Sequence, residues 1–515
     1  MGGRLGLNVY FIEALAFEYS LNNCSLSLSN KLRTRGNCYS EHVETVTPNL
    51  RPKKMEEKNK RMILVFFLVI AAIFQVCFSA ASQSQPPPKI RSTPSTAANR
   101  FGSSAVFRVT GNVYPLGYYS VSLEIGNPPK LYDLDIDTGS DLTWVQCDAP
   151  CKGCTKPRDA LYNPRGNLVP CKHPLCSNIH LPANLNCETS DDQCDYEVEY
   201  ADHGSSLGVL VIDHIPLRLT NGSIFGPRLA FGCGYDQRYP SSNLLPPTAG
   251  VLGLGKGKAS IISQLHGLGV IRNVLGHCLS GRGGGFLFLG DDLVPSSGIS
   301  WAPMSRTRLE KHYSAGPAEL LFGGKATGVK GLQVVFDSGS SYTYFSSQAY
   351  KTTLDLVTRG LNGKPLKGTT EDGALPICWK GTKPFKAIRD VKDYFEPLLL
   401  SFTKNVQLHL PPENYLIVTK HGNVCLGILN GSEVGLENFN IIGDISLQDK
   451  MVIFDNEKRQ IGWLSADCNR LPNVDRDYKE SFWQPYAADF GILQENCPTT
   501  AEKSQKPRRR KYSEL

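Results

Sequence analysis

One short pattern occurs twice in the 515-residue chain, 200 residues apart. In the first half, YDLDIDTGSDLTWVQC places Asp-Thr-Gly-Ser at 137–140, and in the second half, VVFDSGSSYTYF places Asp-Ser-Gly-Ser at 337–340. Later in each half, two apolar residues precede a glycine. These glycines, Gly253 and Gly443, lie 116 and 106 residues after the aspartates. An internal duplication of such long period predicts two similar lobes, with the equivalent aspartates meeting at the seam between them.

The segments between these motifs predict a mostly β fold. Short alternating runs such as YYSVSLEIG, DYEVEYAD and GVLVIDHIPLRL are separated by Gly, Asn and Pro, as strands are by turns. Helical patterns are few, and the best lie at 260–269 and 347–363. A hydrophobic content of 41% and a charged content of 20% are typical of a globular protein.

Two facing Asp-hydroxyl-Gly turns predict acid–base chemistry, whereas a single one is typical of an ordinary turn. Carboxylates held about 3 Å apart cannot both ionise easily, so they share a proton. One can then act as a base that activates water and the other as an acid. The candidate pair is Asp137 and Asp337; the predicted supporting residues are the turn glycines Gly139 and Gly339 and the hydroxyl residues Thr138, Ser140, Ser338 and Ser340.

At these residues the chain resembles the pepsin-like aspartic proteases, and it is most similar to their plant nucellin-like and nepenthesin-like branch. The two turns, Trp144 seven residues after the first aspartate, the paired apolar-apolar-Gly elements and a Cys-rich insert from Cys147 to Cys194 carry the resemblance, which covers about residues 113–470. It implies a bilobal fold with the active-site cleft between the lobes. It also implies hydrolysis of peptide bonds at acid pH, between bulky apolar residues, with no cofactor or metal. Tyr200 is implied to be the flap tyrosine, supported by Trp144.

An alternative within the same fold is a catalytically inactive binding or inhibitor protein. Such relatives usually lose a catalytic aspartate, a hydroxyl residue or the flap, and this chain keeps all of them. The flap segment YADHGS is one residue longer than the usual pattern of the family. The other acids near the first turn are assigned no chemistry: Asp133 and Asp135 are expected to face outward from their strand, and Asp141 to lie beyond the turn.

The sequence predicts a targeting signal near the N-terminus. We expect 1–54 to be a gene-model extension or cytosolic stub, 55–81 a signal peptide and 82–112 a pro-segment or linker, since 62–80 is an apolar stretch after basic residues. If 62–80 is retained, it is instead a membrane anchor. The remaining predicted parts are an N-terminal lobe at 113–300, a C-terminal lobe at 301–470 and a tail with a basic end at 471–515. The expected location is the secretory pathway, with the apoplast or vacuole as destination and a membrane-anchored form as alternative.

Sixteen cysteines support an oxidising compartment, and thirteen of them follow the signal segment. The C-x-x-C at 151–154, with His173 nearby, leaves zinc as an alternative to a disulfide. Cys497 is the expected unpaired thiol, and Asn221 and Asn430 lie in glycosylation sequons. The disulfide candidates, whose pairing the sequence leaves open, are Cys147, Cys151, Cys154, Cys171, Cys176, Cys187, Cys194, Cys233, Cys278, Cys378, Cys425 and Cys468.

The net charge of +7 is confined to the chain ends. Residues 1–61 sum to +4 and residues 503–515 to +5, which leaves −2 for the 441 residues between them. A nearly neutral body argues against nucleic-acid binding. The expected partners are therefore protein or peptide substrates. A monomer is expected, because one chain supplies both aspartates.

Overall fold

The computed structural model describes residues 103–179, 187–189, 191–239, 246–306, 311–373, 375–437 and 439–472. The predicted extension, signal peptide or anchor, most of the tail, and Cys497 lie outside this part of the chain. No helix in the described ranges is both long enough and apolar enough to cross a bilayer.

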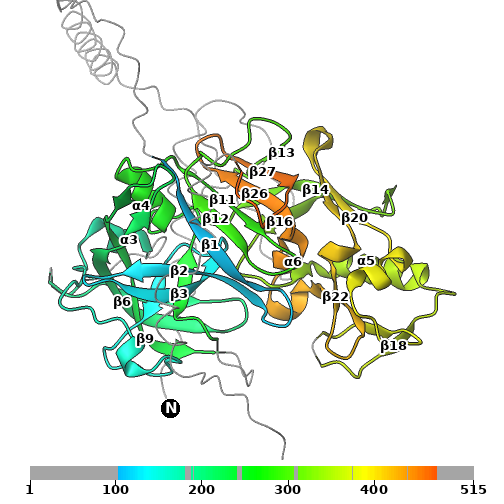
Figure 1. The fold of residues 1–515 in the computed structure, drawn as a ribbon, viewed down its shortest axis with the longest axis horizontal. Helices are drawn as coiled ribbons and strands as arrows, with labels where there is room; N and C mark the ends of the chain where they lie inside the picture. Colours follow the sequence, from blue (N-terminus) through cyan, green and yellow to red (C-terminus); the bar gives the residue numbers. More distant parts are fainter. Residues whose placement is uncertain are drawn as a thin grey trace, which may run out of the picture. The chain divides into compact units, whose positions relative to one another are not determined.

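Most strands of the first half belong to a 13-stranded sheet, which also includes β13, β26 and β27 (Figure 1). Its order is β13-β27-β26-β11-β12-β1-β2-β3-β10-β4-β9-β6-β5. A separate two-stranded sheet pairs β7 with β8. The strands are β1 (Ala105–Asn112), β2 (Tyr118–Ile125), β3 (Lys130–Asp137), β4 (Trp144–Gln146), β5 (Asp195–Glu199), β6 (Ser205–His214), β7 (Leu217–Arg218), β8 (Ile224–Phe225), β9 (Arg228–Arg238), β10 (Gly250–Gly253), β11 (Val274–Leu279), β12 (Gly285–Leu289), β13 (Ser300–Pro303), β26 (Lys450–Asp455) and β27 (Gln460–Ser465).

The second half forms its own lobe from an eight-stranded sheet, in the order β21-β20-β14-β16-β25-β17-β24 with β15 paired to β14. A four-stranded sheet, β18-β19-β23-β22, lies in the same lobe (Figure 1). The strands are β14 (Ser314–Phe322), β15 (Lys325–Ala326), β16 (Leu332–Phe336), β17 (Thr343–Phe345), β18 (Lys367–Thr369), β19 (Cys378–Lys380), β20 (Leu398–Ser401), β21 (Gln407–Leu410), β22 (Leu416–Val418), β23 (Val424–Leu426), β24 (Ile428–Asn430) and β25 (Asn440–Ile442).

Helices are short and few among the described residues. Both helices predicted from the sequence are present, as α4 (Ile261–Gly267) and α5 (Ser347–Gly360). The Ser260 hydroxyl caps α4 by accepting from the Ser263 backbone N–H. The others are α3 (Pro174–Ile179), α6 (Asp444–Leu447) and the 3-10 turns η1 (Arg158–Ala160), η2 (Ile388–Asp390), η3 (Lys392–Tyr394), η4 (Thr403–Asn405), η5 (Pro412–Asn414) and η6 (Gly431–Val434).

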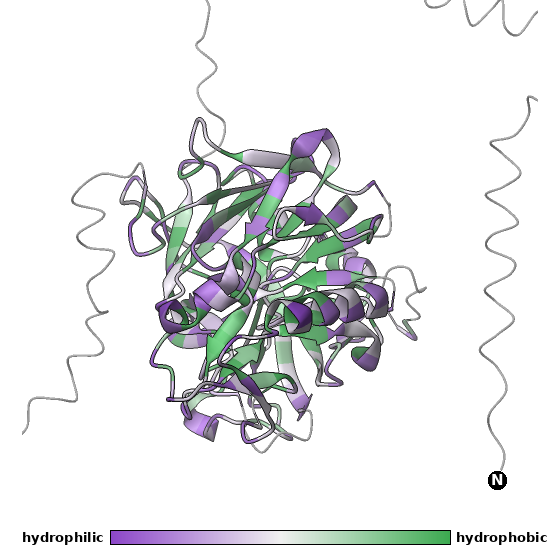
Figure 2. Cartoon of the chain, turned by 90° about the vertical axis from the view of Figure 1, so that its right-hand side faces the viewer, coloured by the Kyte–Doolittle hydropathy of each residue, from purple (hydrophilic) through white to green (hydrophobic). Residues whose placement is uncertain are grey.

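Strand β1 lies inside the range 82–112 that the sequence predicts as pro-segment or linker. It pairs antiparallel with β2 on one side and with β12 on the other. Ala105 is fully buried and Val109 is 1% exposed. Residues 105–112 are therefore an interior strand of the sheet. Apolar residues colour much of the strands, whereas the connecting loops are more polar (Figure 2).

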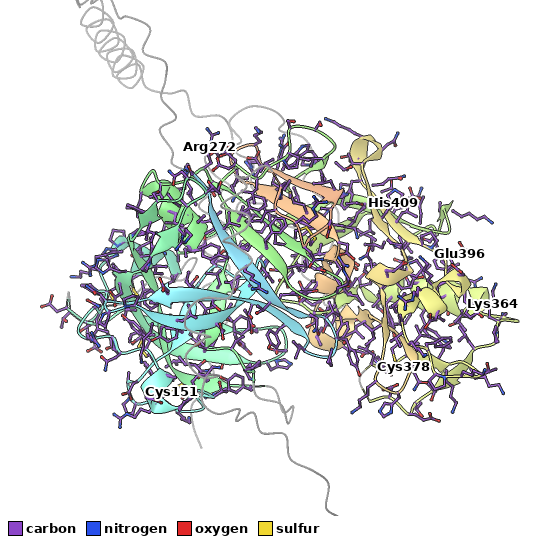
Figure 3. The ribbon with its side chains drawn as sticks, viewed as in Figure 1. Cys151, Arg272, Lys364, Cys378, Glu396 and His409 are labelled. Atoms are coloured by element: carbon purple, nitrogen blue, oxygen red, sulfur yellow. A yellow bond between two sulfur atoms is a disulfide. The ribbon has the colours of Figure 1, made fainter. Side chains whose placement is uncertain are left out.

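All twelve candidate cysteines are paired in the structure. The insert holds Cys147–Cys233, Cys151–Cys154, Cys171–Cys187 and Cys176–Cys194, and the others are Cys278–Cys468 and Cys378–Cys425. Figure 3 shows Cys151 on one lobe and Cys378 on the other. The C-x-x-C that left zinc open is thus a disulfide, and among the described residues no three His, Cys, Asp or Glu are grouped to hold a metal ion.

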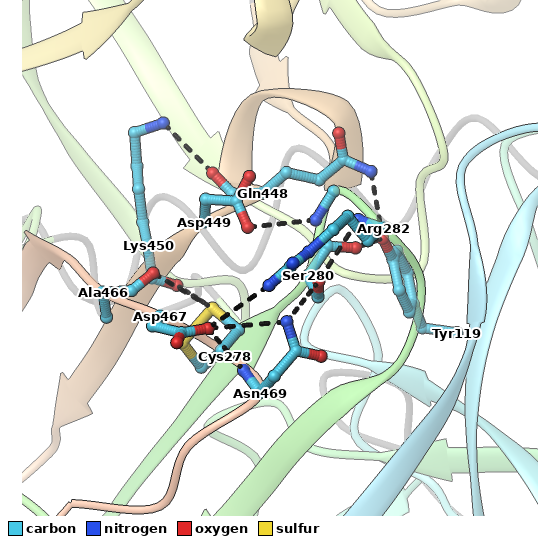
Figure 4. The surroundings of a disulfide bond; sticks show 12 residues. Tyr119, Cys278, Ser280, Arg282, Gln448, Asp449, Lys450, Ala466, Asp467 and Asn469 are labelled. Atoms are coloured by element: carbon cyan, nitrogen blue, oxygen red, sulfur yellow. Dashed lines mark hydrogen bonds and ion pairs between the residues drawn. A yellow bond between two sulfur atoms is a disulfide. The ribbon is translucent and has the colours of Figure 1, made fainter.

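The Cys278–Cys468 disulfide closes the longest loop of the six, with a sequence separation of 190 (Figure 4). We expect the double change Cys278→Ala with Cys468→Ala to lower the free energy of unfolding by about 2–5 kcal/mol, because the unfolded chain regains loop entropy. Guanidinium denaturation of the purified variant measures the loss.

The matched control is Cys151→Ala with Cys154→Ala, because that disulfide spans a separation of only 3 residues and closing a short loop removes less entropy. Equal denaturation midpoints for the wild type and the Cys278/Cys468 variant would contradict the prediction.

Candidate active site

The two halves of the sequence repeat form the same local topology. Asp137 is the last residue of β3, and β10 inserts between β3 and β4, parallel to the first and antiparallel to the second. In the second half Asp337 follows β16, and β25 inserts in the same way between β16 and β17. The apolar-apolar-Gly elements of the sequence are therefore the strands that flank each aspartate.

The glycine at the end of each inserted strand is required by close backbone contact. A Cβ added to Gly253 would lie 2.5 Å from the Asp141 carbonyl carbon. A Cβ added to Gly443 would lie 2.1 Å from the Tyr342 carbonyl oxygen. Both distances are far inside van der Waals contact. In both halves, therefore, a glycine without a side chain lets the inserted strand pack closely against the segment that follows the aspartate turn.

The hydroxyl residues after the aspartates join the two lobes through crossed hydrogen bonds. The Thr138 hydroxyl donates to the Phe336 carbonyl oxygen at 3.0 Å and accepts from the Ser338 N–H at 3.0 Å. The Ser338 hydroxyl donates to the Ile136 carbonyl oxygen at 3.0 Å and accepts from the Thr138 N–H at 3.1 Å. These four buried bonds fix the two turns relative to each other.

The Asp137 carboxylate is oriented by its own turn. Its Oδ1 accepts from the Gly139 N–H at 2.7 Å, and its Oδ2 accepts from the Ser140 hydroxyl. Asp137 is 7% exposed. Both oxygens of this buried carboxylate therefore have a donor that fixes its plane.

Asp337 is held by the equivalent donors of the second turn. Its Oδ1 accepts from the Gly339 N–H at 2.9 Å, and its Oδ2 accepts from the Ser340 hydroxyl at 2.8 Å. A Cβ added to Gly339 would lie 2.5 Å from Asp137 Oδ1, and one added to Gly139 would lie 2.5 Å from Asp337 Oδ1. Each carboxylate therefore packs on the glycine of the opposite turn, which only glycine allows.

Burial raises the pKa of Asp137 above the ordinary carboxyl value, and the nearby charge of Asp337 raises it further. Hydrogen bonds from Ser140 and Gly139 oppose this rise, and a side-chain hydrogen bond with Asp337 adds to it. A hydrogen bond between two carboxyl groups requires one proton between them. The pair can therefore hold a single shared proton, with one group ionised and one neutral.

Asp135 lies on the outward face of β3, as predicted, but its side chain is half-buried rather than exposed. Its Oδ2 accepts from the Thr248 hydroxyl at 3.0 Å, and its Oδ1 is enclosed without a hydrogen-bond partner among the described residues. Burial raises the pKa of Asp135 to about 7. The segment before β10 covers this part of β3, whereas Asp133, two residues earlier on the same face, is exposed as predicted.

Asp141 lies beyond the turn, and its carboxylate is enclosed by the glycines that follow β10. The Gly257 N–H donates to Asp141 Oδ1 at 2.8 Å, and a Cβ on Gly255 would lie 2.3 Å from that oxygen. Burial raises the pKa of Asp141. The glycines of the stretch 250–257 (GVLGLGKG) thus allow the backbone to approach the Asp141 carboxylate.

The segment around Tyr200 forms a hairpin next to the aspartate pair. Tyr200 follows β5, and its N–H donates to the Gly204 carbonyl oxygen at 2.9 Å, just before β6 begins. The Trp144 indole N–H donates to the Tyr200 hydroxyl at 2.7 Å. Burial raises the pKa of Tyr200, and the charge of Asp137 adds to the rise. The hairpin therefore places its tyrosine beside the first aspartate, with Trp144 holding the ring.

Three residues near the pair were not predicted from the sequence. His312 Nδ1 lies 2.8 Å from the Gly139 carbonyl oxygen, so it binds the first turn from the second half of the chain. Asp444 follows the second apolar-apolar-Gly element, and burial and the charge of Asp337 raise its pKa. The pKa of Tyr344 on β17 is raised by burial and by the Asp202 and Asp337 charges. Only Asp444 had a sequence signal, its place directly after Gly443.

The two sequon asparagines lie in different surroundings. Asn221 is exposed in the turn between β7 and β8. Asn430 is half-buried, and its side-chain amide donates to Glu433 at 3.0 Å while its oxygen accepts from the Ser432 hydroxyl at 2.7 Å. Of the two, Asn221 offers the more accessible amide.

The sequence matches two family models that cover most of the described region. The model described as xylanase inhibitor N-terminal matches residues 119–291, and the xylanase inhibitor C-terminal model matches residues 319–465. An aspartic proteinase of Oryza sativa subsp. japonica is 46% identical over 385 residues, which cover 72% of this chain and 92% of that protein. Nepenthesin-1, an aspartic proteinase of Nepenthes gracilis, is 26% identical and covers 68% of this chain and 78% of its own length.

Solved structures share the fold at low sequence identity. Soybean basic 7S globulin aligns with a TM-score of 0.55 at 16% identity, over 71% of this chain and 97% of its own. An aspartic proteinase from Irpex lacteus aligns with a TM-score of 0.52 at 16% identity, over 71% and 98%. Together with the family match, these alignments confirm the predicted mostly β, bilobal pepsin-like fold.

Proposed function

This chain belongs to the plant family of pepsin-like aspartic proteases, and on that basis we propose that Asp137 and Asp337 are the catalytic pair of an aspartic endopeptidase. The observation that carries the proposal is the equivalent packing of the two carboxylates, because each contacts the glycine of the opposite turn. Two carboxyl groups in matched environments can alternate as acid and base.

The proposed reaction needs one proton on the pair and one water between the carboxyl groups. The ionised carboxylate takes a proton from the water as its oxygen attacks the peptide carbonyl carbon. The neutral carboxyl gives its proton to the carbonyl oxygen, so that a neutral tetrahedral diol forms. Collapse of the diol breaks the C–N bond and gives the carboxylic acid product. The proton taken from water passes to the departing nitrogen, and one diol hydroxyl returns its proton to the carboxylate that had acted as the acid. The pair again holds one proton at the end.

Activity is therefore expected at acid pH. Burial and the charge of Asp337 raise the pKa of Asp137, so the pair keeps its shared proton to a higher pH than one exposed carboxyl would. As pH rises above that range both groups ionise and the acid is lost. As pH falls far enough, both groups are protonated and the base is lost.

The Tyr200 hairpin is proposed to close over the substrate, with Trp144 setting the position of the tyrosine ring. We expect Trp144→Phe and Tyr200→Phe each to lower kcat/KM about tenfold, since each removes the same hydrogen bond. Steady-state cleavage of a chromogenic peptide measures both, with the thermal midpoint as a check on folding.

The double variant tests whether the two residues act through one bond. We expect the double variant to lose no more than about tenfold in kcat/KM, because either single change already removes the one hydrogen bond between the two side chains. A roughly hundredfold, additive loss would contradict the shared role.

Protein and peptide substrates are the proposed partners. The preference for bulky apolar residues at the cleaved bond stays a prediction. A monomer is proposed, because one chain carries both aspartates.

The proposed location is the secretory pathway, leading to the apoplast or the vacuole. Six disulfides among the described residues support an oxidising compartment. The membrane-anchored alternative depends on residues 62–80, and fractionation of cells expressing the tagged full chain distinguishes the two forms.

Cleavage of a denatured protein from about pH 3 to about pH 7 tests the function. The oxidised chain begun at Met55 is compared with and without a peptide inhibitor that carries a tetrahedral hydroxyl in place of the scissile carbonyl. We expect an acid optimum and inhibition, because such a group mimics the diol. An absence of cleavage at every pH would overturn the proposal and favour the inactive binding or inhibitor protein, which is otherwise disfavoured by the intact pair and hairpin.

A further inference from the structure

A cavity lies in the first lobe, away from the aspartate pair. It has a volume of about 420 Å³ and is formed by the turn between β2 and β3, the segment 162–167, the end of β6 and the start of β9 (labelled in Figure 1). β3 runs from Lys130 at this cavity to Asp137 at the active site. At about 3.3 Å per residue, the two sites are about 23 Å apart along the strand. The cavity is therefore separate from the proposed catalytic cleft.

The rim of this cavity carries three exposed cations, Lys130, Arg165 and Arg228. Arg165 Nη1 donates to the Asn127 carbonyl oxygen at 3.1 Å, and Arg228 Nη2 donates to the Ile212 carbonyl oxygen at 3.2 Å. These backbone contacts anchor each guanidinium and leave other donors of its five N–H groups available. In the described part of the chain, no carboxylate forms an ion pair with any of the three.

The floor of the cavity is a buried, fully hydrogen-bonded carboxylate. Asp213 is 7% exposed; its Oδ2 accepts from the Tyr162 hydroxyl at 2.8 Å and from the Asn167 amide at 3.0 Å. Its Oδ1 accepts from the His214 N–H at 2.8 Å. These bonds hold Tyr162 and Asn167 in place, and the one ion-pair partner of Asp213 among the described residues is His214 rather than a rim cation.

Arg165 lines the cavity together with two tyrosines, Tyr132 and Tyr162. Burial raises the pKa of the floor residue Tyr132 to about 12, and the charge of Arg165 opposes that rise while Asp213 adds to it. Tyr132 and Tyr162 meet edge to face, with ring centroids 6.5 Å apart. The cavity thus combines an aromatic floor, amide side chains and an unpaired cationic rim.

We propose that this cavity binds a small anionic ligand, a sugar that carries a carboxylate or phosphate group. Arg165 and Arg228 hold the anionic group by charge-assisted hydrogen bonds. The amides of Asn163 and Asn167 hold hydroxyl groups of the sugar. The volume lies in the range of small-molecule sites, which is about 300–1,000 Å³. The inference does not depend on the proposed proteolysis.

Isothermal titration of the full chain with glucuronate and with glucose 6-phosphate tests the site and distinguishes the two anionic groups. We expect at least one of them to bind, with neutral glucose much weaker and with affinity falling as salt is added. Arg165→Gln and Arg228→Gln should each raise the dissociation constant about tenfold or more, since each removes a charged donor.

Arg218→Gln is the matched control, because Arg218 is an exposed arginine of the same lobe that does not line the cavity. It should bind like the wild type. The ligand should also leave the rate of peptide cleavage unchanged, since the cavity is far from the aspartate pair. Failure of both anionic sugars to bind, or binding that survives both cavity substitutions, would overturn the proposal. If Arg165→Gln does not fold, the dissociation constant of Arg228→Gln decides: a rise of about tenfold or more supports the proposal, and an unchanged value overturns it.

Discussion

Asp137→Asn and Asp337→Asn should each lower kcat for peptide cleavage by about a thousandfold or more, because either change removes one member of the acid–base pair. An asparagine keeps the shape and can still accept from the turn N–H groups that now orient the carboxylate. It can neither take a proton from water nor give one to the carbonyl oxygen. The loss should therefore appear in kcat, with KM changed little.

The matched control for this prediction is Asp133→Asn, on the same strand and face as Asp137 but exposed. Its carboxylate accepts from the Ser122 hydroxyl at 2.5 Å and touches neither turn, so we expect wild-type kcat. The assay is initial-rate cleavage at the acid optimum, with the thermal midpoint of each variant as the folding check. Activity retained by a folded Asp137→Asn or Asp337→Asn protein would refute the assignment of the pair.

The folded state should lose stability as pH rises from about 4 to about 7. Burial raises the pKa of Asp135 from 3.8 to about 7, so in this interval the folded chain holds a proton that the unfolded chain has released. As pH rises, the free energy of unfolding falls wherever the folded state binds more protons than the unfolded state. For Asp135 this decrease is about 4 kcal/mol at most. The raised pKa values of Asp137, Asp141 and Asp444 act in the same direction.

One buried group opposes this trend. Burial lowers the pKa of His277 from 6.5 to about 4, so below pH 6.5 the unfolded chain binds the extra proton and stability falls toward acid. Four carboxyl groups act against this single imidazole in the same interval, so the carboxyl groups should decide the net slope. A protein of this kind is then most stable in the acid range where we expect it to be active.

Thermal midpoints measured at intervals from about pH 4 to about pH 7 test this expectation. Asp135→Asn should flatten the decline, because it removes one of the carboxyl groups whose pKa is raised. His277→Leu should steepen it, because it removes the opposing group. A midpoint that rises steadily with pH in the wild type, or a slope that Asp135→Asn leaves unchanged, would contradict the account.

The catalytic pair could be found from the sequence because its signal is local and repeated. Each half contains an Asp-hydroxyl-Gly turn and an apolar-apolar-Gly strand. Asp137 and Asp337 therefore have equivalent positions in the two halves. The hairpin at Tyr200 and the two main helices were also readable, since turns and short amphipathic segments depend on nearby residues. The resemblance to a known family then supplied the arrangement of the lobes.

Only the tertiary structure decided which groups meet across long sequence distances. The alternation of β3 placed Asp135 on the open face, yet Thr248, from a segment more than one hundred residues later, covers it. His312 contacts Gly139 from the opposite half of the chain. Arg165, in a loop, and Arg228, at the start of β9, line one cavity. The twelve cysteines could be named as candidates but not paired. Local patterns determine strands, turns and the motif at each aspartate, whereas burial, pairing and electrostatic environment depend on contacts that exist only after the chain has folded.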